Sequence, residues 1–111
     1  MVNIQSHHLD LIFHALSDPT RRAMLSCLTR CERPITQVAE PFKISLPAIS
    51  KHVKVLERAR LVKRRKQGSS SYLSLNAESM QTANQWMEHY RKFWEQRFDA
   101  LEAFLNKEKK K

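Results

Sequence analysis

The chain has few of the residues that build loops. Its 111 residues include one glycine, Gly68, and four prolines. Sites that hold phosphate on a loop need several closely spaced glycines, and no such loop can be formed here. The sequence also shows no credible metal cluster and no nucleophile paired with a base. We therefore expect neither enzymatic activity nor a bound cofactor.

Cysteine and long apolar runs are also scarce. Two cysteines are too few for a disulfide framework, and we expect them to be reduced thiols. No apolar run approaches the ~20 residues of a membrane span. Residues 1–5 lack a basic start followed by an apolar stretch, so we expect no signal peptide. These absences predict a cytoplasmic protein without a membrane partner.

Acidic residues are outnumbered by basic ones, 11 to 20, which gives a net charge of +9. The excess is concentrated rather than spread. Residues 43–66 hold nine Lys or Arg and a single acid, Glu57, and the rest of the chain is nearly balanced apart from a lysine tail. Charge gathered in this way indicates a binding surface for an acidic partner.

Length and composition predict one domain with a single small core. Apolar spacing and capping residues predict helices over 7–16, 19–30, 36–42 (capped by Thr36), 46–59 and 76–105, and strands over 61–66 and 71–75. The predicted fold class is mostly α, a winged helix-turn-helix with a two-stranded β-hairpin wing and a long C-terminal dimerisation helix. We expect this single domain over 1–106 and a disordered lysine-rich tail over 107–111.

The helix expected over 46–59 separates into two faces when its residues are placed at 100° steps. The apolar half must pack on the domain; it includes Leu46 and also His52, for which a structural role is favoured. The other half has small residues near the helix start and cations further along, which suits close approach to the major groove. The residues expected to face DNA are Ser45, Pro47, Ala48, Ser50, Lys51, Lys54 and Arg58.

Two neighbouring features favour DNA binding over a merely solvated amphipathic helix. A short helix and a tight turn precede it, which is helix-turn-helix order, and a strongly basic hairpin follows. Such a hairpin can contact the phosphate backbone or the minor groove, while the helix reads the sequence. The wing residues expected to contact double-stranded DNA are Lys63, Arg64, Arg65, Lys66, Gln67 and Ser69.

The last predicted helix is too long and too apolar for a single chain to cover its apolar face. It would extend for roughly 40 Å, whereas a compact domain of this size has a radius of gyration near ~13 Å. It carries both tryptophans and three of the five phenylalanines. We expect a homodimer that places two recognition helices about one DNA turn (~34 Å) apart on an inverted-repeat operator. The expected interface residues are Leu9, Ile12, Phe13, Met87, Tyr90, Trp94, Phe98 and Leu101.

Three stretches carry a family resemblance that spans about residues 8–105. Residues 15–25 (ALSDPTRRAML) resemble the opening signature of the ArsR family of bacterial repressors. Residues 44–59 (ISLPAISKHVKVLERA) are similar to its recognition-helix motif. Residues 86–101 look like the dimerisation helix of one subgroup.

The resemblance implies a dimer that represses transcription by occupying its operator, often at its own promoter. It places Pro47, Ser50 and Lys51 near the bases and the hairpin on the backbone or in the minor groove. Two positions depart from the family pattern. Arg60 stands where the family has a helix-ending glycine, so this arginine is expected in a left-handed conformation. Pro41 is unusual in the third helix, where it predicts a kink or an early stop.

The sequence leaves the signal that this protein senses open. Many family members bind metal through cysteines on the third helix or through Asp and His on the last, and we expect both sites to be absent here. Cys27 and Cys31 lie one turn apart and could hold a soft metal or respond to oxidants, although buried or incidental thiols are commoner. Two alternatives therefore stand: a thiol-based redox or metal-sensing repressor, and a module that binds DNA without specificity or binds another protein.

Overall fold

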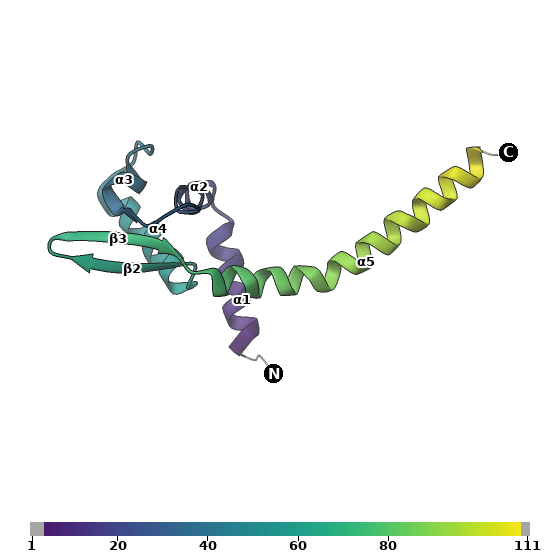
Figure 1. Ribbon diagram of the computed structural model, residues 1–111, viewed down its shortest axis with the longest axis horizontal. Coiled ribbons are helices and arrows are strands. Elements are labelled where there is room, and N and C mark those ends of the chain that lie inside the picture. The colour runs from purple at the N-terminus through teal and green to yellow at the C-terminus, as the bar shows by residue number, and fades with distance from the viewer. Residues whose placement is uncertain (1–3, 110–111) are drawn as a thin grey trace.

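The computed structural model describes residues 4–109, with side chains from His7 onwards. Figure 1 shows a small cluster of helices, a protruding hairpin and one long helix that leaves the cluster. The elements are α1 (Ile4–Leu16), α2 (Pro19–Cys27), β1 (Arg33–Pro34), α3 (Ile35–Ala39), α4 (Leu46–Arg58), β2 (Val62–Gln67), β3 (Ser70–Leu75) and α5 (Ala77–Lys109). Within this range no helix is both long and apolar enough to cross a membrane.

Side-chain caps begin α2 and α4 where the sequence predicts them. The Asp18 carboxylate accepts a hydrogen bond from the backbone N–H of Arg21 over 3.0 Å. This bond holds the pKa of Asp18 below its ordinary value, since it stabilises the charged form. The Ser45 hydroxyl oxygen accepts from the backbone N–H of Ala48 over 3.3 Å at the start of α4. Both caps satisfy amide groups that have no partner within their own helix.

The ends of α2 and α3 differ from the expected boundaries. α3 starts at Ile35, with Pro34 in the capping position and no side-chain cap, so the prediction that Thr36 caps this helix is wrong. Pro41 follows the end of α3 and gives the early stop that its missing N–H predicts. α2 ends at Cys27 instead of continuing to residue 30.

The sheet has three antiparallel strands in the order β1-β3-β2. β2 and β3 form the predicted hairpin, paired as far as Gln67 and Ser70, which leaves Gly68 and Ser69 as the turn. Gly68 has φ +61°, a conformation that glycine adopts without steric cost. β1 was not predicted, because two residues that include Pro34 show no strand periodicity; they pair with residues 72–73 of β3.

Arg60 ends α4 in the left-handed conformation, with φ +58°, as its place in the family pattern predicts. Its backbone N–H donates to the Glu57 carbonyl over 2.9 Å, and the N–H of Leu61 donates to the Leu56 carbonyl over 3.0 Å. These two bonds form the Schellman termination, in which glycine is usual. The chain thus turns sharply from the recognition helix into the wing.

Each of five elements contributes fully buried apolar side chains to the core. Among them are Ile12 of α1, Met24 of α2, Val38 of α3, Leu56 of α4 and Leu73 of β3. Because Ile12 is buried within its own chain, its assignment to a dimer interface is wrong. Leu46 was assigned to the packed half of α4, yet it is 72% exposed at the beginning of that helix.

α5 extends far beyond the core. It has 33 residues, about 50 Å of helix, and no residue past Ala83 is buried in the described chain. The molecule measures 71 × 37 × 22 Å, and its radius of gyration of 19.4 Å exceeds the ~13 Å of a compact domain. In Figure 1 the projecting helix points away from every other element.

The C-terminal tail differs from its prediction. Residues 107–109 belong to α5, so the expectation of disorder from residue 107 is wrong for them, and Lys110 and Lys111 lie outside the described residues. The division at residue 106 stays a prediction. Overall the fold is the predicted mostly helical winged helix-turn-helix, with a small antiparallel sheet and a long C-terminal helix.

Candidate nucleic-acid interface

The recognition helix α4 is held by its apolar face and presents its cations to solvent. Ile49, Val53 and Leu56 are buried and attach α4 to the core. Of the residues expected to face DNA, Ala48 is half-buried and the others are exposed: Ser45, Pro47, Ser50, Lys51, Lys54 and Arg58. The helix therefore offers small residues beside the exposed Leu46 at its N-terminal end and positive charge along the next two turns.

The wing presents all six of its predicted residues on the surface, but they differ in what they contact. Lys63, Arg64, Arg65, Lys66, Gln67 and Ser69 are all exposed. Arg64 pairs with Glu57 of α4 over 2.9 Å, which joins the wing to the recognition helix. Lys63 and Lys66 make no ion pair within the described chain, so their charge is available to a partner.

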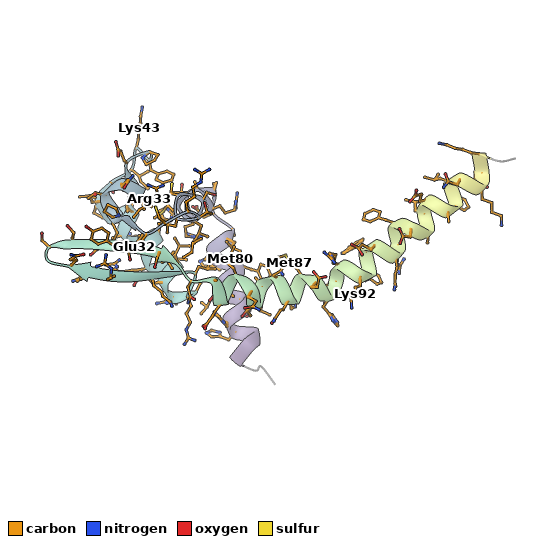
Figure 2. The ribbon with its side chains drawn as sticks, in the orientation of Figure 1. Glu32, Arg33, Lys43, Met80, Met87 and Lys92 are labelled. Atoms are coloured by element: carbon orange, nitrogen blue, oxygen red, sulfur yellow. The ribbon has the colours of Figure 1, made fainter. Side chains whose placement is uncertain are left out.

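Arg65 is anchored by a group of contacts at the centre of the wing. Its Nη2 and Nε donate to the two carboxylate oxygens of Glu32 over 2.7 and 3.2 Å, and Nη1 donates to Gln67 over 2.8 Å. The guanidinium also lies 4.7 Å from the centroid of the Tyr72 ring. Figure 2 shows Glu32 beside the hairpin, on the segment that precedes β1.

The pairing of Glu32 with Arg65 shifts both pKa values so that the charged form of each side chain is favoured. The guanidinium hydrogen bonds lower the pKa of Glu32, and the carboxylate raises the pKa of Arg65. Two donated hydrogen bonds in fork geometry orient the guanidinium more firmly than a single contact would. Arg65 therefore fixes the wing against the segment before β1, a role that the sequence analysis did not foresee.

Arg21 is a second residue that the sequence analysis missed. It is 8% exposed, and its Nε and Nη2 donate to the carbonyls of Ala15 and His14 over 2.7 and 3.0 Å. Its Nη1 lies 3.2 Å from His52 Nδ1, which must accept, since a guanidinium only donates. Arg21 thus ties the end of α1 to α4, and His52 has the structural role expected of it. The sequence could have indicated this burial, because Arg21 lies one turn before Met24 on α2 and therefore on the same face of the helix.

An exposed aromatic stripe runs along α5 and begins at α1. The Phe13 and Trp86 rings meet edge to face at 5.4 Å, and Trp86 lies 4.8 Å from Tyr90. Further along, Trp94 and Phe98 are 56% and 64% exposed. Figure 2 shows that α5 beyond Met87 has no other element of the chain beside it. The exposed large apolar residues of this stripe are Phe13, Trp86, Met87, Tyr90, Phe93, Trp94, Phe98, Leu101, Phe104 and Leu105.

Both cysteines are free thiols, Cys27 half-buried and Cys31 exposed. Between residues 4 and 109 no group of three or more His, Cys, Asp or Glu side chains is arranged to hold a metal ion. The absence of a metal site and the role of the thiols stay predictions.

The chain is similar to known transcriptional regulators. Residues 16–65 match a family model described as a helix-turn-helix domain. The chain is 38% identical over 76 residues to the transcriptional repressor SdpR of Bacillus subtilis (strain 168), covering 68% of this chain and 84% of SdpR. A crystal structure of an ArsR family transcriptional regulator matches with TM-score 0.77 and 33% identity, covering 86% of this chain and 97% of that one. The homodimeric winged helix-turn-helix DNA-binding domain of Mb0332 from Mycobacterium bovis, in a solution structure, shares the fold with TM-score 0.62 and 20% identity, covering 77% of this chain and 82% of that one.

The fold and the exposed basic helix define a winged helix-turn-helix regulator that binds DNA. The chain belongs to the ArsR family of winged helix-turn-helix transcriptional repressors, as the sequence resemblance indicates. It is a DNA-binding repressor and not an enzyme.

Proposed function

We propose that this repressor is a homodimer that binds an inverted-repeat operator, and that it acts in the cytoplasm, where bacterial DNA lies. The observation that carries the proposal is the exposed aromatic stripe of α5. These large apolar side chains are roughly half exposed, and together they form a larger apolar patch than a soluble monomer usually leaves in water. The homodimeric relative of the same fold supports a second copy of this chain as the partner that covers it.

The proposed division of labour follows from what each cation contacts within its own chain. Pro47, Ser50 and Lys51 lie in the first turns of α4, which in helix-turn-helix proteins approach the base edges. Lys54 and Arg58 follow on the exposed face and would contact phosphates. In the wing, Lys63, Lys66 and the tip residues Gln67 and Ser69 would contact the backbone or the minor groove, while Arg64 and Arg65 hold the wing in place.

Selection of binding sites from a random DNA pool, followed by footprinting at rising salt, tests the proposal. A repressor of this kind should enrich a palindrome whose half-site centres are about 10 base pairs, or a multiple of that, apart. It should keep protecting that palindrome at salt concentrations that remove non-specific binding. Loss of all protection together would show a sequence-independent DNA-binding module instead.

A further inference from the structure

A hollow lies between α1 and α4, and three of the cations proposed to contact DNA form part of its lining. Its volume is about 360 Å³, and it is lined by Leu11, His14, Lys51, Lys54, Val55 and Arg58. A second hollow of about 150 Å³ also has Leu11 and Arg58 in its lining. The first hollow alone has the volume of a site for a small ligand.

The floor of this hollow is apolar and its rim is positively charged. Leu11 and Val55 are half-buried and pack against the core, while Lys51, Lys54 and Arg58 are exposed. No carboxylate lines either hollow. Glu57, the only acid of α4, is paired with Arg64 over 2.9 Å. The rim charges are therefore not neutralised by the residues around them.

We propose that this hollow binds a small amphipathic carboxylate, such as a medium-chain fatty acid, and that the bound ligand displaces DNA. The alkyl chain would lie on Leu11 and Val55, and the carboxylate would accept charge-assisted hydrogen bonds from Lys54 and Arg58. A purely polar anion has nothing to place on the apolar floor, and a neutral alcohol lacks the charge that the rim complements. This regulatory step rests on the proposed function, because the same cations would otherwise face DNA. Ligand and DNA must then weaken each other's binding reciprocally.

Direct binding to the full chain is measured first, without DNA. Decanoate, below its micelle-forming concentration, is titrated by calorimetry and by amide shifts of the ¹⁵N-labelled protein. Decanol and acetate are the matched probes that lack the charge or the chain. We expect decanoate to bind at least about tenfold more tightly than either, with shifts centred on Leu11, Val55 and Arg58. Equal affinity for decanol, or shifts confined to the aromatic stripe of α5, would overturn the site.

Paired variants separate a local effect of charge from a general one. The double variant Lys54→Gln/Arg58→Gln removes two charges from the rim, and Lys63→Gln/Lys66→Gln removes two from the wing. All four positions are exposed, so circular dichroism should show both variants folded. We expect decanoate affinity to fall about tenfold in the first and by less than about twofold in the second. Equal losses would mean that decanoate responds only to net charge.

Competition is then measured on wild-type protein with the DNA site found by selection. Decanoate should release that DNA at concentrations near its own Kd, and decanol should not. Selective DNA binding without any decanoate binding would overturn this inference and leave the proposed function intact. Decanoate binding in a protein that selects no site would overturn the proposed function and leave the ligand site. Decanoate and DNA bound together without mutual effect would overturn the displacement.

Discussion

At the scale of single residues, several cations of this basic protein hold its own structure together. Arg21 satisfies carbonyls at the end of α1, Arg64 joins the wing to α4, and Arg65 is clamped by Glu32. Charge counting treats such side chains as equivalent to lysines that face solvent. The contacts show that these arginines differ from solvent-facing lysines. A substitution of one of them is therefore expected to affect the stability of the structure as well as DNA binding.

The Glu32–Arg65 clamp makes a prediction about pKa. In Arg65→Gln the carboxyl of Glu32 should return from its lowered pKa toward its ordinary value, because the charge that favours ionisation is gone. Since the shift is downward, the pair is intact at neutral pH and is lost only as pH falls through the lowered pKa. An NMR titration of the Glu32 carboxyl carbon measures this. An unchanged titration in the variant would mean that Arg65 does not engage Glu32 in solution.

The left-handed conformation of Arg60 makes a prediction about stability. Because a side chain at φ +58° costs energy that glycine avoids, Arg60→Gly should raise the free energy of unfolding by about 0.5–1 kcal/mol. Urea denaturation measures the difference. Arg58→Gly is the matched control within α4, where glycine should instead destabilise by up to about 1 kcal/mol. A loss of stability in both variants would contradict the argument.

At the scale of elements, α4 and the wing should divide sequence reading from general affinity. Lys51→Ala should lower affinity for the operator by about 1–3 kcal/mol and affect random DNA less, because the first turns of α4 are the part proposed to approach the bases. Lys66→Ala should weaken both DNAs alike and reduce the slope of log affinity against log salt by about 1. Fluorescence anisotropy over a salt series measures both quantities. The same loss on both DNAs for both variants would remove the division.

Arg65→Ala is the less informative wing variant, although the charge pattern alone ranks it beside Lys66→Ala. It would remove a cation and also release the clamp to Glu32, Gln67 and Tyr72. A uniform loss of DNA affinity would then have two causes. The variant Glu32→Gln complements Arg65→Ala, since it loosens the contacts that hold Arg65 and keeps the positive charge of Arg65.

At the scale of the whole molecule, the proposed dimer depends on the exposed stripe of α5. Trp94→Glu should convert a dimer into a folded monomer at micromolar concentration, because it places a charge within the proposed apolar interface between the two chains. The fold should be kept, since Trp94 is not among the residues packed against the core of its own chain. Sedimentation velocity measures the assembly, and circular dichroism shows whether the fold is kept. Gln96→Glu is the control, with the same added charge on the same helix. A wild-type monomer would sink the dimer proposal, and equal dissociation in both variants would show a charge effect.

Those features that depend on neighbours in the chain were determined by the sequence alone. The caps at Asp18 and Ser45 and the Gly68 turn each follow from a few adjacent residues, and the left-handed Arg60 was implied by the family resemblance. The amphipathic spacing of α4 likewise predicted a basic outer face and a packed inner one, because helical periodicity converts sequence into faces directly. The fold class was readable for the same reason, and the family was indicated by the resemblance of residues 15–25 and 44–59 to its motifs.

The tertiary structure alone decided which distant residues meet. Glu32 and Arg65 are 33 positions apart, and β1 is a strand only because β3 lies beside it. Ile12 has the spacing of an interface residue, yet the packing of α1 buries it. The hollow is lined by residues of both α1 and α4, so it depends on how these two helices pack. Such features depend on how elements pack, and local periodicity carries no information about that packing.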